Sequence, residues 1–320
     1  MWLFIKKVFL FLLISIFGYS MLFILISFNP QLQNRTNIKS ATGGYGASLL
    51  RYRETLKTNN IDVLFCGSSH CYRGFDTRIF NKAGIRSFNF GSSAQTPLNT
   101  FYLLKDFASE MQPKKIVLEV YWITLQNKGV ESAIDLISNT QTTQNNFIMG
   151  MSTHTFDPLK TWIYQKLHRL KFPLDYEELL PSKVDTYIPG GFVETIRDSN
   201  KFFIKEIRDK IPLDSFVQLA YIDSIYQYCL TNQIDLILIN TPVYELVVMS
   251  IPNYIEKMGE IKQFAFERNL QFIDFNSDEN YQHGNWNPAI DWYDDTHLTQ
   301  RGVKKFNNLL IEKYGKLLKD

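Results

Sequence analysis

Residues 61–70 are Ile61-Asp62-Val63-Leu64-Phe65-Cys66-Gly67-Ser68-Ser69-His70, a short apolar run with an abrupt polar end. An apolar, partly β-branched run that is closed by a glycine is typical of a buried parallel strand. The Gly-Ser-Ser-His corner then lies at the carboxyl end of that strand, which is where open α/β sheets bind their ligands. We therefore expect the rest of the chain to be arranged around this corner.

Apolar runs of strand length recur along the chain and alternate with segments of helical periodicity. This alternation predicts a three-layer α/β/α sandwich, in which helices cover both faces of a five-stranded parallel sheet. The expected strands are 61–66, 85–90, 115–121, 235–240 and 271–275, and the expected helices are 97–111, 213–232, 251–269 and 299–318. Periodicity is lost at about 126–212, which we interpret as an insertion or cap over the sheet.

The first 30 residues predict a membrane anchor. The stretch from Val8 to Phe28 is uncharged and close to the ~20 residues that a helix needs to cross a bilayer, and no small-residue cleavage site follows it. Residues 31–57 are polar and glycine-containing, which favours a juxtamembrane stalk, and 58–320 would form the soluble domain. Lys6, Lys7 and the amino terminus precede the span while Arg35 and Lys39 follow it, which gives a slight bias towards a cytoplasmic amino terminus. We expect a single-pass protein with its soluble domain outside.

Composition excludes several classes of partner. The 34 basic and 32 acidic residues give a net charge of +2 without long runs of either sign, so no nucleic-acid surface is expected. The three cysteines form no CxxC pair, and neither a Gly-x-Gly-x-x-Gly nor a P-loop lysine is present. We therefore expect no disulfide framework, no metal site and no nucleotide or other cofactor.

The serine corner has candidate partners near the end of the chain. A serine nucleophile needs a general base within hydrogen-bond reach, and the base needs a third group to orient it. Ser69 would be the nucleophile, His297 the base and Asp294 the orienting carboxylate, because an Asp-x-x-His turn can place the carboxylate on the imidazole Nδ1. The backbone amides of Ser69 and Gly91, each at the end of a strand, could together bind an oxyanion.

These motifs together resemble the SGNH/GDSL hydrolases. Gly67-Ser68-Ser69 is similar to the first sequence block of that family, Gly91 after a strand to the second, and Asp294-x-x-His297 before the last helix to the fifth. The likeness extends over roughly 61–318. It implies a flavodoxin-like sheet and ester chemistry on carbohydrate or lipid esters.

The chain also departs from the family pattern. Gly-Ser-Ser replaces Gly-Asp-Ser, and the Gly-x-Asn-Asp of the third block is absent, with Glu119-Val120-Tyr121-Trp122 at the matching strand end. The family's oxyanion asparagine therefore has no counterpart there, and Gln95, Asn89 or Tyr121 could supply the missing donor.

The variant pattern, together with an amino-terminal anchor, resembles SGNH-like proteins of the bacterial envelope that work beside membrane-bound O-acyltransferases. Proteins of alginate O-acetylation and of teichoic-acid D-alanylation are examples. This resemblance implies that the substrate is an envelope glycan or another acyl ester, that a membrane-bound O-acyltransferase is a possible partner, and that the serine passes an acyl group to or from a polymer hydroxyl. It also favours a soluble domain outside the cytoplasm, since an enzyme on envelope polymers must face outward.

Alternatives remain at each position. Ser69 could simply cap a helix after the strand. His70 is a rival base and Asp295 a rival orienting carboxylate. The whole domain could also be a catalytically idle module that binds a membrane O-acyltransferase or a polymer, and the missing oxyanion residue supports that reading.

Overall fold

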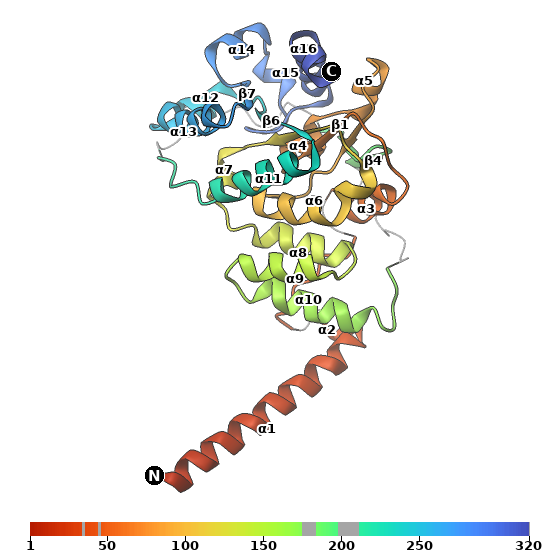
Figure 1. Ribbon diagram of the computed structural model, residues 1–320, viewed down its shortest axis with the longest axis vertical. Coiled ribbons are helices and arrows are strands. Elements are labelled where there is room, and N and C mark those ends of the chain that lie inside the picture. Colours follow the sequence, from red (N-terminus) through yellow and green to blue (C-terminus); the bar gives the residue numbers. More distant parts are fainter. Residues whose placement is uncertain (34–35, 44–45, 175–183, 198–210, 320) are drawn as a thin grey trace.

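The computed structural model describes residues 1–320 except 34–35, 44–45, 175–183, 198–210 and 320 (Figure 1). Its centre is a five-stranded sheet in the order β2-β1-β3-β6-β7, and every pairing in it is parallel. The strands are β1 (Val63–Cys66), β2 (Ser87–Asn89), β3 (Lys115–Glu119), β6 (Asp235–Asn240) and β7 (Gln271–Asp274). The predicted α/β class with a five-stranded parallel sheet is confirmed.

Alternating side chains of the strands point to two separate cores. Leu64, Ile116 and Leu238 pack on one face against α6, α11 and α13, whereas Val63, Val117 and Ile237 pack on the other against α5 and α16. Both faces are apolar because helices cover both. The helices that border these cores are α4 (Ser69–Gly74), α5 (Thr77–Lys82), α6 (Pro97–Met111), α7 (Trp122–Gln126), α11 (Leu219–Asn232), α12 (Glu245–Met249), α13 (Tyr254–Glu267), α14 (Asp278–His283), α15 (Pro288–Asp291) and α16 (Gln300–Lys319).

Local sequence accounts for where several helices begin. Pro97 occupies the first turn of α6, and Thr96 and Asn99 form a reciprocal capping box at its start. Asp76 caps α5 by accepting a hydrogen bond from the Arg78 amide at 3.0 Å. These caps satisfy backbone donors that a helix leaves without partners.

The predicted insertion at 126–212 contains three helices and a hairpin within its described part; 175–183 and 198–210 lie outside the described residues. The helices are α8 (Val130–Asn139), α9 (Gln144–Ser152) and α10 (Asp157–His168), and the antiparallel hairpin is β4 (Asp185–Ile188) with β5 (Phe192–Thr195). The helices lie between α1 and the sheet (Figure 1). The hairpin instead packs beside β2, where the Asn89 amide donates to Gly190 O at 2.7 Å.

The amino-terminal segment begins with α1 (Trp2–Ser27), which is long and apolar enough to cross a membrane. A short helix, α2 (Pro30–Gln33), follows. The segment predicted as a stalk is not a free spacer throughout, because α3 (Ser48–Thr55) packs into the domain with Leu49 and Arg51 fully buried. Arg51 Nε donates to the carbonyl of Gly191 at 3.0 Å.

Replacing Phe306 by Ala should destabilise the domain. The Phe306 ring is fully buried, with its centroid 5.3 Å from that of Phe75 and 4.9 Å from that of Phe275. Loss of such a ring costs about 3–5 kcal/mol of unfolding free energy because it leaves a cavity. Denaturant unfolding of the solubilised full chain measures the loss. Phe266→Ala is the matched control, because that ring is 79% exposed, and an equal effect of both variants would contradict the assigned core.

Candidate active site

The corner between β1 and α4 is shaped by Gly67. Its φ of +151° is unfavourable for other residues, and a Cβ at this position would lie 2.6 Å from the Cβ of Glu119. Ser68 caps α4, since its side chain accepts a hydrogen bond from the His70 amide at 3.2 Å. The cap is therefore Ser68 and not Ser69, which leaves the Ser69 hydroxyl available for another partner.

The loop before α16 brings Asp294 and His297 together. One carboxylate oxygen of Asp294 accepts hydrogen bonds from the Thr296 amide at 2.9 Å and from the His297 amide at 2.7 Å. This turn places the two carboxylate oxygens 3.1 and 3.0 Å from His297 Nδ1. The Asp-x-x-His spacing thus positions the carboxylate beside the ring, as the sequence predicts.

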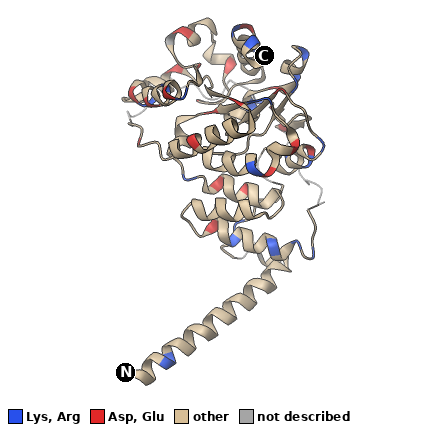
Figure 2. Ribbon diagram, in the orientation of Figure 1, with Lys and Arg blue, Asp and Glu red and all other residues tan. Residues whose placement is uncertain are grey.

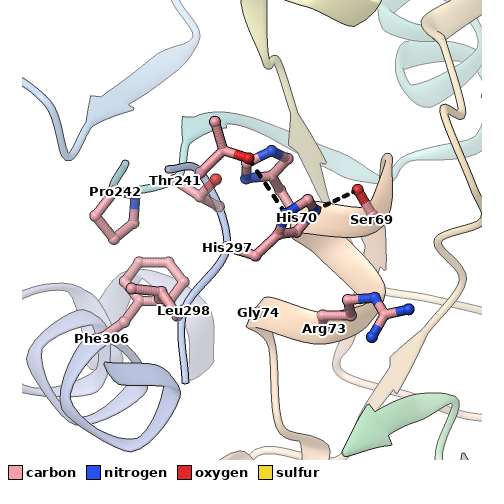
Figure 3. A pocket seen from close by; sticks show the side chains of 10 residues that line it. Ser69, His70, Arg73, Gly74, Thr241, Pro242, His297, Leu298 and Phe306 are labelled. Carbon is pink, nitrogen blue, oxygen red and sulfur yellow. Dashed lines mark hydrogen bonds between the residues drawn. The ribbon is translucent and has the colours of Figure 1, made fainter. Parts of the chain in front are cut away.

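Ser69 and His297 meet at the carboxyl end of the sheet. Ser69 Oγ lies 2.8 Å from His297 Nε2, and Figure 3 shows the bond between the two side chains. Because the carboxylate of Asp294 can only accept, we assign the ring proton to Nδ1, which leaves Nε2 free to accept from the serine hydroxyl. The three residues thus have the arrangement of a nucleophile, a base and an orienting acid.

The charge state of Asp294 fits this arrangement. Partial burial opposes its ionisation, but the hydrogen bond and the charge interaction with His297, together with two backbone amides, lower its pKa to about 2. The group is therefore an anion at neutral pH. An imidazolium that formed on His297 would be stabilised by this anion.

The ring of His297 lies nearly parallel to two neighbouring rings. Tyr293 stacks on it with a centroid distance of 5.6 Å and an interplanar angle of 8°, and His70 stacks on it at 4.6 Å and 19°. Burial, followed by the nearby His297, lowers the pKa of His70 well below its usual range, so His70 is neutral. His70, the rival base, stacks on the His297 ring, and the imidazole within hydrogen-bond distance of the Ser69 hydroxyl is that of His297. Tyr293 was not predicted, although it directly precedes Asp294.

The candidate oxyanion donors differ in availability. The Ser69 amide has no hydrogen-bond partner among the described residues, whereas the Gly91 amide donates to Asn89 Oδ1 at 3.2 Å. An oxyanion role for Gly91 would require that bond to be exchanged. Both side-chain amides are in use within the structure: Asn89 Nδ2 donates to the carbonyls of Cys71 and Phe75, and Gln95 Nε2 donates to Thr100.

Tyr121 and Asp295 complete the set of predicted residues. Tyr121 stacks on His70 at 4.1 Å, and its hydroxyl has no hydrogen-bond partner in the described part of the chain. Burial raises the pKa of Tyr121, so the hydroxyl keeps its proton and can donate it. Asp295 is next to Asp294, but the carboxylate on the imidazole is that of Asp294.

Glu119 lies directly behind the serine corner. One carboxylate oxygen accepts a hydrogen bond from the Ser68 amide at 2.8 Å, and the other, Oε1, is buried without a hydrogen-bond partner among the described residues. Burial raises the pKa of Glu119 to about 7, although hydrogen bonds with Ser68 oppose the shift. From the sequence this residue counted only as a departure from a family motif. A carboxylate at the end of an apolar strand was the available signal.

The space beside the two histidines is small. A cavity of about 10 Å³ is lined by Ser69, His70, Arg73 and His297 together with Thr241 and Pro242, and it has room for about one water molecule (Figure 3). Arg73 forms a two-pronged ion pair with Asp185 of β4, which joins the hairpin to α4. Within the described residues, no group of three His, Cys, Asp or Glu side chains is arranged to hold a metal.

No family model and no curated protein matches the chain. Among solved structures, an acylhydrolase from Bacteroides fragilis is 15% identical with a TM-score of 0.42, over 84% of this chain and 97% of that one. A GDSL-like lipase from Bacteroides thetaiotaomicron is 11% identical with a TM-score of 0.43, over 84% and 98%. An acetylxylan esterase from Geobacillus stearothermophilus is 14% identical with a TM-score of 0.40, over 81% and 95%. At identities and TM-scores this low, we draw no functional conclusion from the likeness.

Glu119→Gln should change how stability depends on pH. A carboxyl whose pKa rises from 4.5 to about 7 on folding keeps its proton in the native state, so its stabilising effect is present below pH 4.5 and is lost as pH rises through 7. Glutamine has no such proton to lose but can still accept from the Ser68 amide. The unfolding free energy of Glu119→Gln relative to wild type should therefore increase by about 3 kcal/mol between pH 4.5 and 7.5.

Denaturant unfolding of both proteins across this pH range measures the difference. Burial raises the pKa of Asp135 in α8 to about 7 as well, so Asp135→Asn should show a pH-dependent gain of the same sign and serves as the positive control. Parallel stability curves for wild type and Glu119→Gln would show that Glu119 is ionised in the native state.

Proposed function

We propose that this chain is a membrane-anchored serine esterase or O-acyltransferase that works through an acyl-Ser69 intermediate. The observation that carries the proposal is the 2.8 Å contact of Ser69 Oγ with His297 Nε2, with Asp294 on the opposite ring nitrogen. A hydroxyl that merely caps a helix would have no need of an oriented imidazole, and Ser68 already caps α4. Acyl transfer is the reaction class that these three groups serve.

The geometry supports a two-stage reaction. Ser69 Oγ attacks the ester carbonyl carbon while His297 Nε2 takes the hydroxyl proton, and Asp294 stabilises the imidazolium. The tetrahedral intermediate then expels the alcohol, which leaves with the proton from His297, and an acyl-Ser69 ester remains. Water or a second hydroxyl attacks this ester with His297 again as base. The bond between Ser69 Oγ and the acyl carbon then breaks, and Ser69 takes the proton back from His297. The Ser69 amide is the available donor to the oxyanion, and the Tyr121 hydroxyl is a second candidate.

The alternative function is a catalytically idle binding module. The observation that favours it is the Gly91 amide, which is bonded to Asn89 and so not free to bind an oxyanion. An idle module would retain the sheet and the serine corner for packing alone. Reactivity of Ser69 towards a mechanism-based probe separates the two functions.

For the substrate we propose an acyl ester of a cell-envelope glycan, with a membrane-bound O-acyltransferase as a possible partner. The support is the sequence pattern together with α1, which is long and apolar enough to cross a membrane. Lys6 and Lys7 before the span favour an extracytoplasmic domain, and Figure 2 shows this charge at the amino-terminal end of α1. Protease added to intact cells should cleave the domain, and complete protection would contradict this orientation.

Ser69 should be the site of acylation. The solubilised full chain should react with a serine-directed phosphonate and hydrolyse a chromogenic acetyl ester, and Ser69→Ala should lose both activities. Intact-mass measurement and peptide mapping locate the adduct. Ser93→Ala is the matched control, because Ser93 follows the next strand along the chain but its hydroxyl donates to Glu131. No labelling and no turnover in wild type would favour the idle module.

The same assay tests the orienting carboxylate with a matched pair. Asp294→Asn should lower turnover by a factor on the order of 10³ or more, because the amide no longer fixes the imidazole tautomer. Asp295→Asn removes the neighbouring charge and should have a much smaller effect. Equal losses in the two variants would mean that general electrostatics, and not the bond to Nδ1, governs the rate. Adding sugar hydroxyls as acceptors then separates transfer from hydrolysis.

A further inference from the structure

The layer formed by α9 and α10 exposes an unusual amount of apolar surface. Phe156, Ile163 and Leu170 follow one another at intervals of seven residues and so lie along one side of α10 and its ends, with exposed fractions of 82%, 45% and 76%. On the neighbouring helix α9, Phe147, Ile148 and Met151 are also exposed. We call these six residues the α9–α10 face.

This face is next to the proposed membrane anchor. Phe23 and Ile26 of α1 pack with Tyr164 and Leu167 of α10, and His168 Nδ1 lies 2.9 Å from the carbonyl oxygen of Ser27. Figure 1 shows α9 and α10 as the layer nearest the carboxyl end of α1. The anchor therefore leaves the domain from the same helix that carries the exposed apolar side chains.

The length of α1 sets the level of the membrane surface. From Val8 to Ser27 the helix extends about 30 Å at 1.5 Å per residue, which equals the thickness of the hydrocarbon core. With the lysines before Val8 in one headgroup layer, Ser27 and its contact with α10 reach the other. The α9–α10 face then lies at the depth of the lipid headgroups.

The charges around this face suit an anionic lipid surface. Helix α9 has no charged residue, and the exposed Lys166 and Lys171 follow on and after α10. Lys166 Nζ lies over the Trp162 ring, 5.2 Å from its centroid, so a cation and an aromatic ring lie together beside this face. Of two acids near the face, Asp157 forms ion pairs with Lys39 and Lys160, and Asp106 of α6 accepts hydrogen bonds from Thr143 and Asn145 at the start of α9. Exposed apolar side chains with aromatic rings and lysines are typical of membrane-interface segments.

We propose that the α9–α10 face docks on the bilayer that holds α1, so that the domain is seated on the membrane at two places. This proposal rests on the membrane anchor put forward above. Elsewhere on the domain, Ile255 and Phe266 are 87% and 79% exposed on α13, but that helix, unlike α9, is rich in charge, with three glutamates and two lysines. Helix α13 also lies far from α1 in Figure 1, so the two residues serve as matched controls.

Depth measurements on the full chain test the proposal. The native cysteines Cys66, Cys71 and Cys229 are buried, so an environment-sensitive thiol dye will label a single introduced cysteine. The variants are Ile163→Cys and Leu170→Cys on the face, Phe266→Cys on α13 and Ile14→Cys within α1. Each is reconstituted into vesicles of phosphatidylcholine and phosphatidylglycerol, with or without lipids that carry a doxyl quencher.

The dyes at 163 and 170 should shift to the blue and be quenched by shallow doxyl lipids, whereas the dye at 266 should remain accessible to aqueous iodide. Iodide quenching at 163 and 170 equal to that at 266, with the dye at 14 quenched by deep doxyl lipids, would overturn the docking while the anchor stands. An unquenched dye at 14 would overturn the anchor itself. Shielding from both iodide and doxyl lipid would mean that a second copy covers the face, which also contradicts the proposal.

Discussion

The close packing of Gly67 on Glu119 is the constraint on which the candidate site depends. A side chain at position 67 would overlap Glu119, and only an unusual backbone conformation lets β1 turn into α4 at this point. The buried carboxyl then holds the Ser68 amide, and Ser68 in turn caps the helix. Ser69 is thus presented on a corner whose backbone is fixed from behind. A nucleophile gains from this because its position is set before the substrate arrives.

His297 lies in a loop whose two ends are held together by hydrogen bonds. Asp291 is fully buried, and its carboxylate accepts from the Asn287 amide at 2.8 Å and from Lys305 Nζ at 2.7 Å. Its carbonyl accepts from the Thr299 amide at 2.9 Å, and the Tyr293 amide donates to the carbonyl of His297 at 3.1 Å. The short segment between these bonds carries Asp294 and His297. The rings of Tyr293 and His70 then stack on the imidazole.

The sequence predicted the sheet because its strands are apolar runs buried on both faces, a pattern that depends on local composition. The Ser69, His297 and Asp294 grouping could be predicted because two of its members lie three residues apart and the third ends a strand. The helices of the insertion at 126–212 were harder to predict from the sequence. In α8, Val130, Ala133, Ile134 and Ile137 do recur at helical spacing, so this helix could have been predicted and was missed because polar residues that are also buried, such as Asp135 and Asn139, lie among them. The partner of the Gly91 amide was not predictable, since it depends on where the Asn89 side chain is held by carbonyls of Cys71 and Phe75.

The polar composition of the predicted stalk did not reveal that this segment connects α1 to the candidate site through packed contacts. Ser48 Oγ donates to Asp135 of α8 at 2.6 Å, and α8 packs against α10, to which the end of α1 is bound. In the other direction, Arg51 holds the hairpin at Gly191, and the neighbouring Gly190 accepts from the amide of Asn89 in β2. Asn89 then binds the carbonyl of Cys71 in α4, two residues beyond Ser69. Each link is a buried or partly buried contact, so the serine corner and the amino-terminal helix belong to one packed body. A domain built this way presents its site at a fixed orientation to α1, whereas a flexible stalk would have let it rotate freely.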